Sequence, residues 1–93
     1  MEIKRADRIA YRAYGDRSGG VLLNLDTSLY FGVNEVGALI WELVGSGSDF
    51  ESVVDGLKGK LDDVPDHLAD DVRGFLTMLE ARGLVFVRRA PEG

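Results

Sequence analysis

Histidine and aspartate are the residues of this chain whose types could hold a metal ion or move a proton. His67 is the single histidine, and it stands beside Asp66 and close to Asp70. A structural zinc site needs about four ligands, mostly cysteine or histidine, and the chain has no cysteine. Because the other ligands are missing, we interpret His67 as a solvent-facing residue at the start of a helix.

An acidic group between residues 62 and 71 could suggest a cation site. Its members are Asp62, Asp63, Asp66, Asp70 and Asp71. They lack the alternating spacing and the glycine of a calcium-binding loop. An acid in a first helical turn is also explained by the helix dipole. We therefore interpret the group as a solvated acidic face and expect no metal and no cofactor.

Glycine and tryptophan are the remaining candidates for chemistry. Gly15, Gly19 and Gly20 do not form a phosphate-binding loop, because no Lys-Ser or Lys-Thr follows them. They are typical of a hairpin loop. Trp41 lies inside a predicted helix, where core or rim packing is its expected role. No catalytic constellation is left, so we expect no catalytic residues and a protein that is not an enzyme.

Length and composition predict one small domain. The chain has 93 residues, of which we assign 1–93 to a single domain with a core at about 8–87. Lys and Arg number 11 against 16 Asp and Glu, and the resulting net charge of −5 counts against nucleic acid as a partner. No apolar run suits a signal peptide or a membrane span. We expect a cytoplasmic protein with no membrane partner.

The first third of the chain has the alternating pattern of β-strands. Apolar side chains recur at every second residue in three short segments, 9–14, 21–25 and 29–33. A glycine-rich loop at 15–20 and a turn at 26–28 separate them. This close spacing predicts a three-stranded antiparallel meander.

Three amphipathic helices are predicted to follow. Asn34 can cap the first, Ser48 or Asp49 the second, and Pro65 or Asp66 marks the start of the third, which ends before Gly83. Their apolar stripes are Val36, Leu39, Ile40, Leu43 and Val44, then Phe50, Val53, Val54, Leu57 and Leu61, then Leu68, Val72, Phe75, Leu76 and Leu79. Residues 84–87 are predicted to be a short strand or a buried tail. Three short helices on a small sheet predict one α+β domain.

The third strand segment, 29–33, carries no lysine and no proline. Natural proteins use such residues to block an exposed sheet edge. If this segment lies at an edge, it is a template for an added strand. If it is paired on both sides, it is ordinary core. The pattern alone fits both.

A longer segment, 26–43, is similar to the PqqD-like family, also called RiPP recognition elements. It reads Asp-Thr-Ser-Leu-Tyr-Phe-Gly-Val-Asn-Glu-Val-Gly-Ala-Leu-Ile-Trp-Glu-Leu, and the matching positions are Tyr30, Asn34, Gly37, Ile40, Trp41 and Leu43. Two later blocks, 50–54 and 70–85, also match. The resemblance covers about residues 8–86. Ser28 departs from the family's usual glycine, which bears on the type of turn, and Glu35 departs from its usual proline.

The resemblance implies a winged helix-turn-helix-like fold, with a three-stranded antiparallel N-terminal sheet followed by three helices. It further implies a non-catalytic domain that binds the leader of a ribosomally made precursor peptide. The leader would lie as an extra antiparallel strand against residues 28–33, in a groove shared with the third helix at about 66–82. This implication agrees with the edge alternative above.

The implied peptide-binding residues belong to the third strand and the third helix. The strand contributes Ser28, Leu29, Tyr30, Phe31, Gly32 and Val33. On the helix, Asp71, Gly74 and Met78 share one flank, Arg73 lies on the opposite flank, and Leu76 belongs to the apolar stripe. Either flank fits as the wall of the groove. We expect Phe31 to face the core and Tyr30 to face the peptide.

The free-standing form resembles most the leader-binding protein of lasso peptide pathways. That resemblance implies a leader peptidase and a macrolactam-forming cyclase as partners. The alternatives are a PqqD-type chaperone for a radical SAM peptide-modifying enzyme, a winged-helix DNA-binding protein and a small enzyme. The acidic balance and a third helix with only Arg73 and Arg82 disfavour DNA binding.

Overall fold

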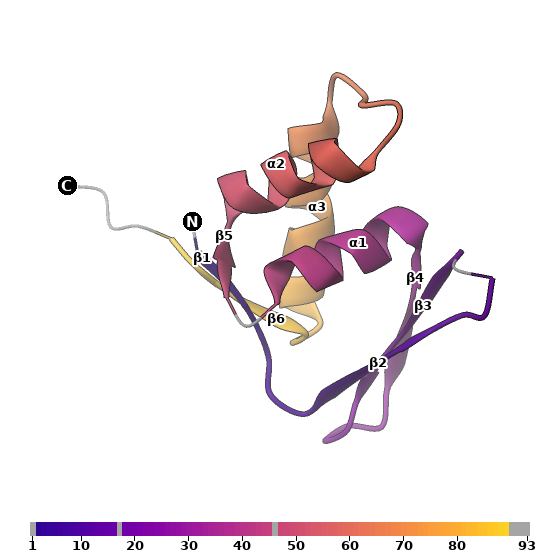
Figure 1. Cartoon of the computed structure of the whole chain (residues 1–93). Helices are drawn as coiled ribbons and strands as arrows, with labels where there is room; N and C mark the ends of the chain where they lie inside the picture. The colour runs from indigo at the N-terminus through magenta and orange to yellow at the C-terminus, as the bar shows by residue number, and fades with distance from the viewer. Residues whose placement is uncertain (1, 17, 46, 90–93) are drawn as a thin grey trace.

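The computed structural model describes residues 2–16, 18–45 and 47–89. Its elements, in chain order, are β1 (Glu2–Arg5), β2 (Ile9–Ala13), β3 (Gly19–Asn24), β4 (Tyr30–Asn34), α1 (Glu35–Val44), β5 (Ser48–Asp49), α2 (Phe50–Lys60), α3 (Leu68–Ala81) and β6 (Val85–Arg88). The strands form two small antiparallel sheets, ordered β2-β3-β4 and β5-β1-β6. Figure 1 shows α1 between these two sheets. The predicted α+β class, with three N-terminal strands followed by three helices, is confirmed.

The predicted meander is the β2-β3-β4 sheet, but its third strand starts later than expected. We expected it from Ser28, whereas β4 begins at Tyr30. Ser28 has φ = 62°, a left-handed conformation that interrupts an extended backbone. Asn24 also draws the chain into a turn, since its side-chain oxygen accepts hydrogen bonds from the N–H groups of Asp26 (2.9 Å) and Thr27 (3.2 Å). The left-handed position is the one where glycine is usual in the family.

The second sheet was not predicted as a sheet. Ile3 of β1 pairs with Ser48 of β5 on one side and with Val87 of β6 on the other. The predicted strand at 84–87 is therefore confirmed as β6, whereas β1 and β5 were missed. Ile3 is fully buried, so the core includes residues before position 8.

The helix ends follow from capping groups. Asn34 accepts a hydrogen bond from the Gly37 N–H (2.8 Å) and caps α1 as predicted. Asp49 caps α2 by accepting from the Ser52 N–H (2.7 Å), and this bond lowers the pKa of Asp49. The third helix starts at Leu68, not at residue 66, because the Leu68 N–H donates to the Pro65 carbonyl (3.2 Å) in a preceding turn.

The buried face of α1 differs from the expected stripe. Trp41 is only 2% exposed and belongs to the core, whereas Val36 is 37% exposed. The reason is that α1 packs between two sheets and must bury two sides. Arg5 of β1 covers Trp41, with its guanidinium 4.6 Å from the ring centroid and its Nε donating to the Trp41 carbonyl (3.1 Å). In the described residues no helix is long and apolar enough to cross a membrane.

The cap of α1 supports a stability prediction. Asn34→Ala removes the acceptor for the Gly37 N–H and should lower the free energy of unfolding by about 1 kcal/mol, a fall in Tm of roughly 4–8 °C. Asn34→Asp keeps an acceptor and should retain most of the stability at neutral pH. Thermal unfolding followed by circular dichroism measures both. Equal losses in the two variants would contradict a capping role.

Candidate functional site

One edge of β4 has no strand partner among the described residues. β4 pairs with β3 on its other side, and the sheet ends there. The Asn24 N–H donates to the Leu29 carbonyl (2.9 Å), which places position 29 in a hydrogen-bonded pair. Since such pairs alternate along an antiparallel ladder, the backbone N–H and C=O groups of Tyr30 and Gly32 point to the open edge. The sequence left open whether this strand lies at a sheet edge or is paired on both sides, and the structure shows that it lies at an edge.

The side chains of β4 divide between two faces as expected. Val33 is buried, and Phe31 is half-buried and packs against the core. Tyr30 is 77% exposed, and Leu29, in the preceding turn, is 71% exposed. Two large side chains are therefore exposed to water at the start of the open edge.

The third helix runs beside this edge and presents one face to it. Asp71, Phe75, Met78 and Arg82 are spaced i, i+4, i+7 and i+11, which places them along one side of a helix and its end. Phe75 packs against the first turn of α1: a Cβ added at Gly37 would lie 3.0 Å from Phe75 Cζ. The Arg82 guanidinium lies 4.9 Å from the ring centroid of Phe31. We call the space between this face of α3 and the open edge of β4 the β4–α3 groove.

Two cavities mark the ends of the β4–α3 groove. The first, of about 460 Å³, is lined by Asn34, Val36, Gly37, Ile40, Leu61, Asp63, Pro65, Leu68, Asp71, Val72 and Phe75. The second, of about 290 Å³, is lined by Asn24, Thr27, Leu29, Tyr30, Phe31, Ala81, Arg82 and Leu84. The first joins the end of β4 to the start of α3, and the second joins the start of β4 to the end of α3. Strand and helix therefore run in opposite directions along the groove.

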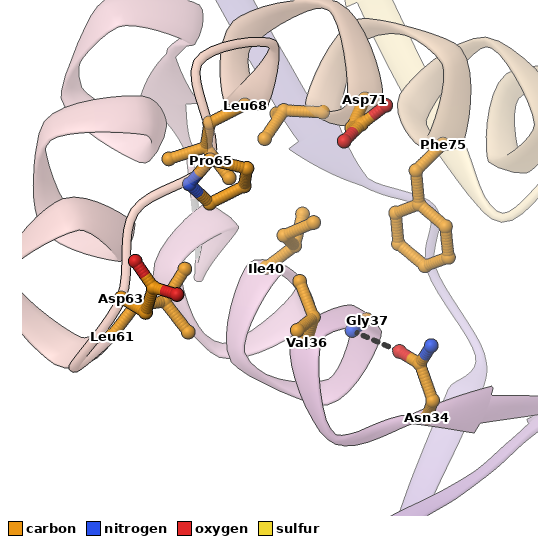
Figure 2. Close-up of a pocket in the computed structure, with 11 residues that line it drawn as sticks. Asn34, Val36, Gly37, Ile40, Leu61, Asp63, Pro65, Leu68, Asp71 and Phe75 are labelled. Carbon is orange, nitrogen blue, oxygen red and sulfur yellow. Dashed lines mark hydrogen bonds between the residues drawn. The ribbon is translucent and has the colours of Figure 1, made fainter.

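The first cavity has an apolar floor and a polar rim. Figure 2 shows Phe75 pointing from α3 toward Gly37, with Val36 and Ile40 of α1 below and Pro65 and Leu68 above. The carboxylates of Asp63 and Asp71 lie on opposite sides of it. Apolar side chains of a ligand can fill such a cavity, while the rim fixes their orientation.

The structure distinguishes between the two flanks of α3. Asp71 lines the first cavity. The helical spacing of 71, 75, 78 and 82 puts Met78, which is 37% exposed, on the same side of α3. Gly74 is next to this side, and a Cβ added there would meet no atom within 4 Å. Arg73 lies on the other side of the helix, with its guanidinium 5.0 Å from the Phe50 ring centroid. It lines a separate cavity with Thr77 and Val87.

Two of the expected site residues therefore lie outside the β4–α3 groove. Arg73 points toward α2 and β6, because α3 packs on both elements with that flank. Leu76 is 2% exposed and belongs to the core, and the cavity that it lines is the separate one beside Arg73. Ser28 and Leu29 precede β4 and are not part of the strand, although Leu29 lines the second cavity.

Sequence reasoning missed several residues of the groove. Phe75 was assigned to the core stripe and Arg82 only to the charge count, yet each lines an end cavity. Gly37 was identified only as a position that matches the family motif. In the structure, the absence of a side chain at Gly37 makes room for Phe75. The spacing of 71, 75, 78 and 82 was the available signal, since it defines a helical side adjacent to the apolar stripe.

The groove offers no evident metal chemistry. In the described part of the chain, no group of three or more His, Cys, Asp or Glu side chains is arranged to hold a metal ion. His67 is exposed at the N-terminus of α3, as expected, and its Nδ1 lies 2.6 Å from Asp71 Oδ2. This pair is a surface interaction at the rim of the first cavity.

An open strand edge beside an apolar groove is the geometry in which domains of the strand-addition class bind an extended peptide. The chain matches the model of the family coenzyme PQQ synthesis protein D (PqqD) over residues 19–85, and it belongs to this family. The resemblance inferred from the sequence is thereby confirmed. No curated protein matches the chain.

Two solved structures share the fold over nearly the whole chain. TbiB1, in complex with the TbiA(beta) leader peptide, is 28% identical, covers 94% of this chain and 99% of its own, and has a TM-score of 0.76. A lasso peptide synthetase B1, complexed with the leader peptide, is 21% identical, covers 94% and 100%, and has a TM-score of 0.72.

The two faces of β4 give a stability prediction. Phe31→Ala should lower the free energy of unfolding by about 2 kcal/mol, because a half-buried ring is removed from the core. Tyr30→Ala should change it by no more than about 0.5 kcal/mol, because the side chain is largely in water. Urea unfolding measures both variants. Equal destabilisation would show that the two side chains do not divide between core and surface.

Proposed function

We propose that this chain is a non-catalytic recognition domain that binds the leader of a ribosomally synthesised precursor peptide as an added strand on β4. The observation that carries the proposal is the open edge of β4 beside the β4–α3 groove. In this role the domain holds the peptide for separate modifying enzymes and contributes no chemistry itself.

The backbone supplies the general part of the binding energy. When a peptide binds, the outward N–H and C=O groups of Tyr30 and Gly32 replace their hydrogen bonds to water with hydrogen bonds to the peptide backbone. These bonds do not depend on the peptide's sequence. Gly32 has no side chain, and a Cβ there would meet only the Tyr14 hydroxyl at 3.8 Å, so an incoming strand meets little bulk on the outer face. β4 carries no lysine, proline or other edge-blocking residue.

Side-chain pockets supply the specific part. Alternate residues of an added strand point to opposite faces, so every second side chain of the peptide enters the groove between β4 and α3. Phe31, Phe75 and Met78 offer apolar contact along the groove, and the two end cavities are large enough for apolar or aromatic anchors. The peptide-binding set that we propose is Ser28, Leu29, Tyr30, Phe31, Gly32, Val33, Asp71, Gly74, Phe75, Met78 and Arg82.

The relatives support a leader peptide as the ligand and a lasso peptide pathway as the setting. TbiB1 and the lasso peptide synthetase B1 were both solved with a leader peptide bound. By analogy, the partners of this chain are a leader peptidase and a macrolactam-forming cyclase, working in the cytoplasm. The family match also favours a second candidate, a PqqD-type chaperone that delivers a precursor to a radical SAM enzyme.

DNA binding has little support from the surface of α3. Asp70, Asp71 and Glu80 outnumber Arg73 along the helix, and the whole chain has a net charge of −5. A recognition helix needs cations for phosphate contacts.

Binding of a leader tests the proposal directly. A fluorescein-labelled synthetic leader, from the precursor encoded beside this chain's gene, should raise its polarisation saturably on titration with the purified protein. Tyr30→Ala should weaken binding several-fold without loss of fold, whereas Phe86→Ala, which removes an exposed aromatic side chain on β6 outside the groove, should not. A leader that shows no saturable binding would refute the proposal.

Strand addition predicts that the effect of a backbone change on affinity alternates between large and small from one peptide residue to the next. N-methylation removes one amide donor at a time from the synthetic leader and leaves the protein untouched. Methylation at residues whose N–H faces Tyr30 or Gly32 should weaken binding at least tenfold, and methylation at the residues between them should have a small effect. Competition binding measures the series. A loss without alternation would exclude β-strand addition.

A further inference from the structure

We infer that the β4–α3 groove selects the direction of the peptide by charge: it takes a segment with basic residues toward its N-terminus and acidic residues a few positions later. This inference rests on the proposed function, since it describes the ligand of the same groove. It is carried by the opposite charges at the two ends of the groove.

The end at Asn34 is acidic. Asp63, from the connection before α3, and Asp71, from the first turns of α3, both line the first cavity, whose lining holds no Lys or Arg. Figure 2 shows their carboxylates on either side of the cavity. Asp71 is paired with His67 (2.6 Å), and Asp63 makes no ion pair within the described residues. A cationic side chain that enters this end meets two carboxylates.

The end at Tyr30 is basic. Arg82 lines the second cavity, whose lining holds no Asp or Glu. Its guanidinium is held against Phe31, 4.9 Å from the ring centroid, so it stays next to the first residues of β4. Asp26, the nearest acid of the adjoining turn, is engaged by Arg8, with Nε 2.5 Å from its Oδ1.

The dipole of α3 opposes this pattern but is too weak to reverse it. A helix end carries the equivalent of about half a unit charge, positive at the N-terminus and negative at the C-terminus. The carboxylate of Asp71 in the first turn of α3, the carboxylate of Asp63 in the connection before it and the guanidinium of Arg82 at its end are full charges of the other sign. The acidic end and the basic end therefore keep their signs.

The direction of the peptide follows from the strand. In antiparallel addition, the N-terminal part of the peptide lies at the Asn34 end of β4 and its C-terminal part at the Tyr30 end. β4 has five residues, and a strand rises about 3.3 Å per residue. The favourable basic and acidic positions in the peptide are therefore about four to six residues apart. A peptide bound in the reverse direction would place its basic residues next to Arg82 and its acidic residues next to Asp63 and Asp71.

Three forms of one leader test the inference. The probe is the synthetic leader of the precursor encoded beside this chain's gene. In the first form, lysine replaces the charged residues of the N-terminal third and glutamate those of the C-terminal third. The second form has these charges exchanged, and the third has glutamine at all of these positions. The first form should bind about tenfold more tightly than the second in low salt, and the ratio should shrink toward one in 0.5 M NaCl.

Variants of the protein locate the effect. The triple variant Asp63→Lys, Asp71→Lys, Arg82→Glu should reverse the preference, and Asp55→Lys, on α2 outside the groove, should leave it unchanged. If the triple variant unfolds, Asp71→Asn and Arg82→Gln should each reduce the ratio about threefold. Equal binding of all three peptide forms would overturn the charge inference and leave the proposed function standing. Failure of every form to bind would overturn both.

Discussion

The packing of Phe75 against Gly37 is the contact on which the geometry of the groove depends. A Cβ at Gly37 would lie 3.0 Å from Phe75 Cζ and 3.1 Å from Val33 Cβ, so the missing side chain lets α3 approach the junction of β4 and α1. Asn34 ties the same junction together by capping α1. The strand edge, the helix wall and the first cavity are thereby fixed relative to one another, as a binding site on rigid elements requires.

Local patterns predicted most of the fold, because most of its elements are defined by short-range periodicity. The alternation at 9–33, the apolar stripes of the three helices and the side-chain caps of α1 and α2 depend on neighbouring residues only. The second sheet was missed because β1 and β5 have no such signal. β5 has two residues, and Ile3 gains its partners from Ser48 and Val87, which lie far along the chain. Pairing of that kind is a property of the tertiary fold.

The site was less predictable than the fold, and α3 shows why. The sequence shows which residues of α3 form its apolar stripe. A flank of polar residues lies on each side of that stripe, and the sequence does not distinguish which flank forms the wall of the groove. The packing of Arg73 on Phe50 settles the orientation, and that contact joins two helices. Trp41 presents the same difficulty. A helix between two sheets buries more than one stripe, so Trp41 reaches the core from a position that a single-sided pattern places at the margin.

An open strand edge can bind a peptide, but it can also pair with another copy of the chain and cause aggregation. The position of α3 beside β4 favours the first and restricts the second. A second sheet can pair with the edge of β4 only if nothing bulky lies beside that edge. Because α3 lies there, the space suits a single extended segment and not a whole sheet. The edge is only five residues long, and the chain's net charge of −5 adds repulsion between copies. Backbone pairing along so short an edge cannot distinguish one peptide from another. In the proposed function, discrimination therefore comes from side-chain contacts along the groove and from the two end cavities, which differ in size and in charge. The opposite signs of those ends are the basis on which we infer that the groove selects the direction of the peptide.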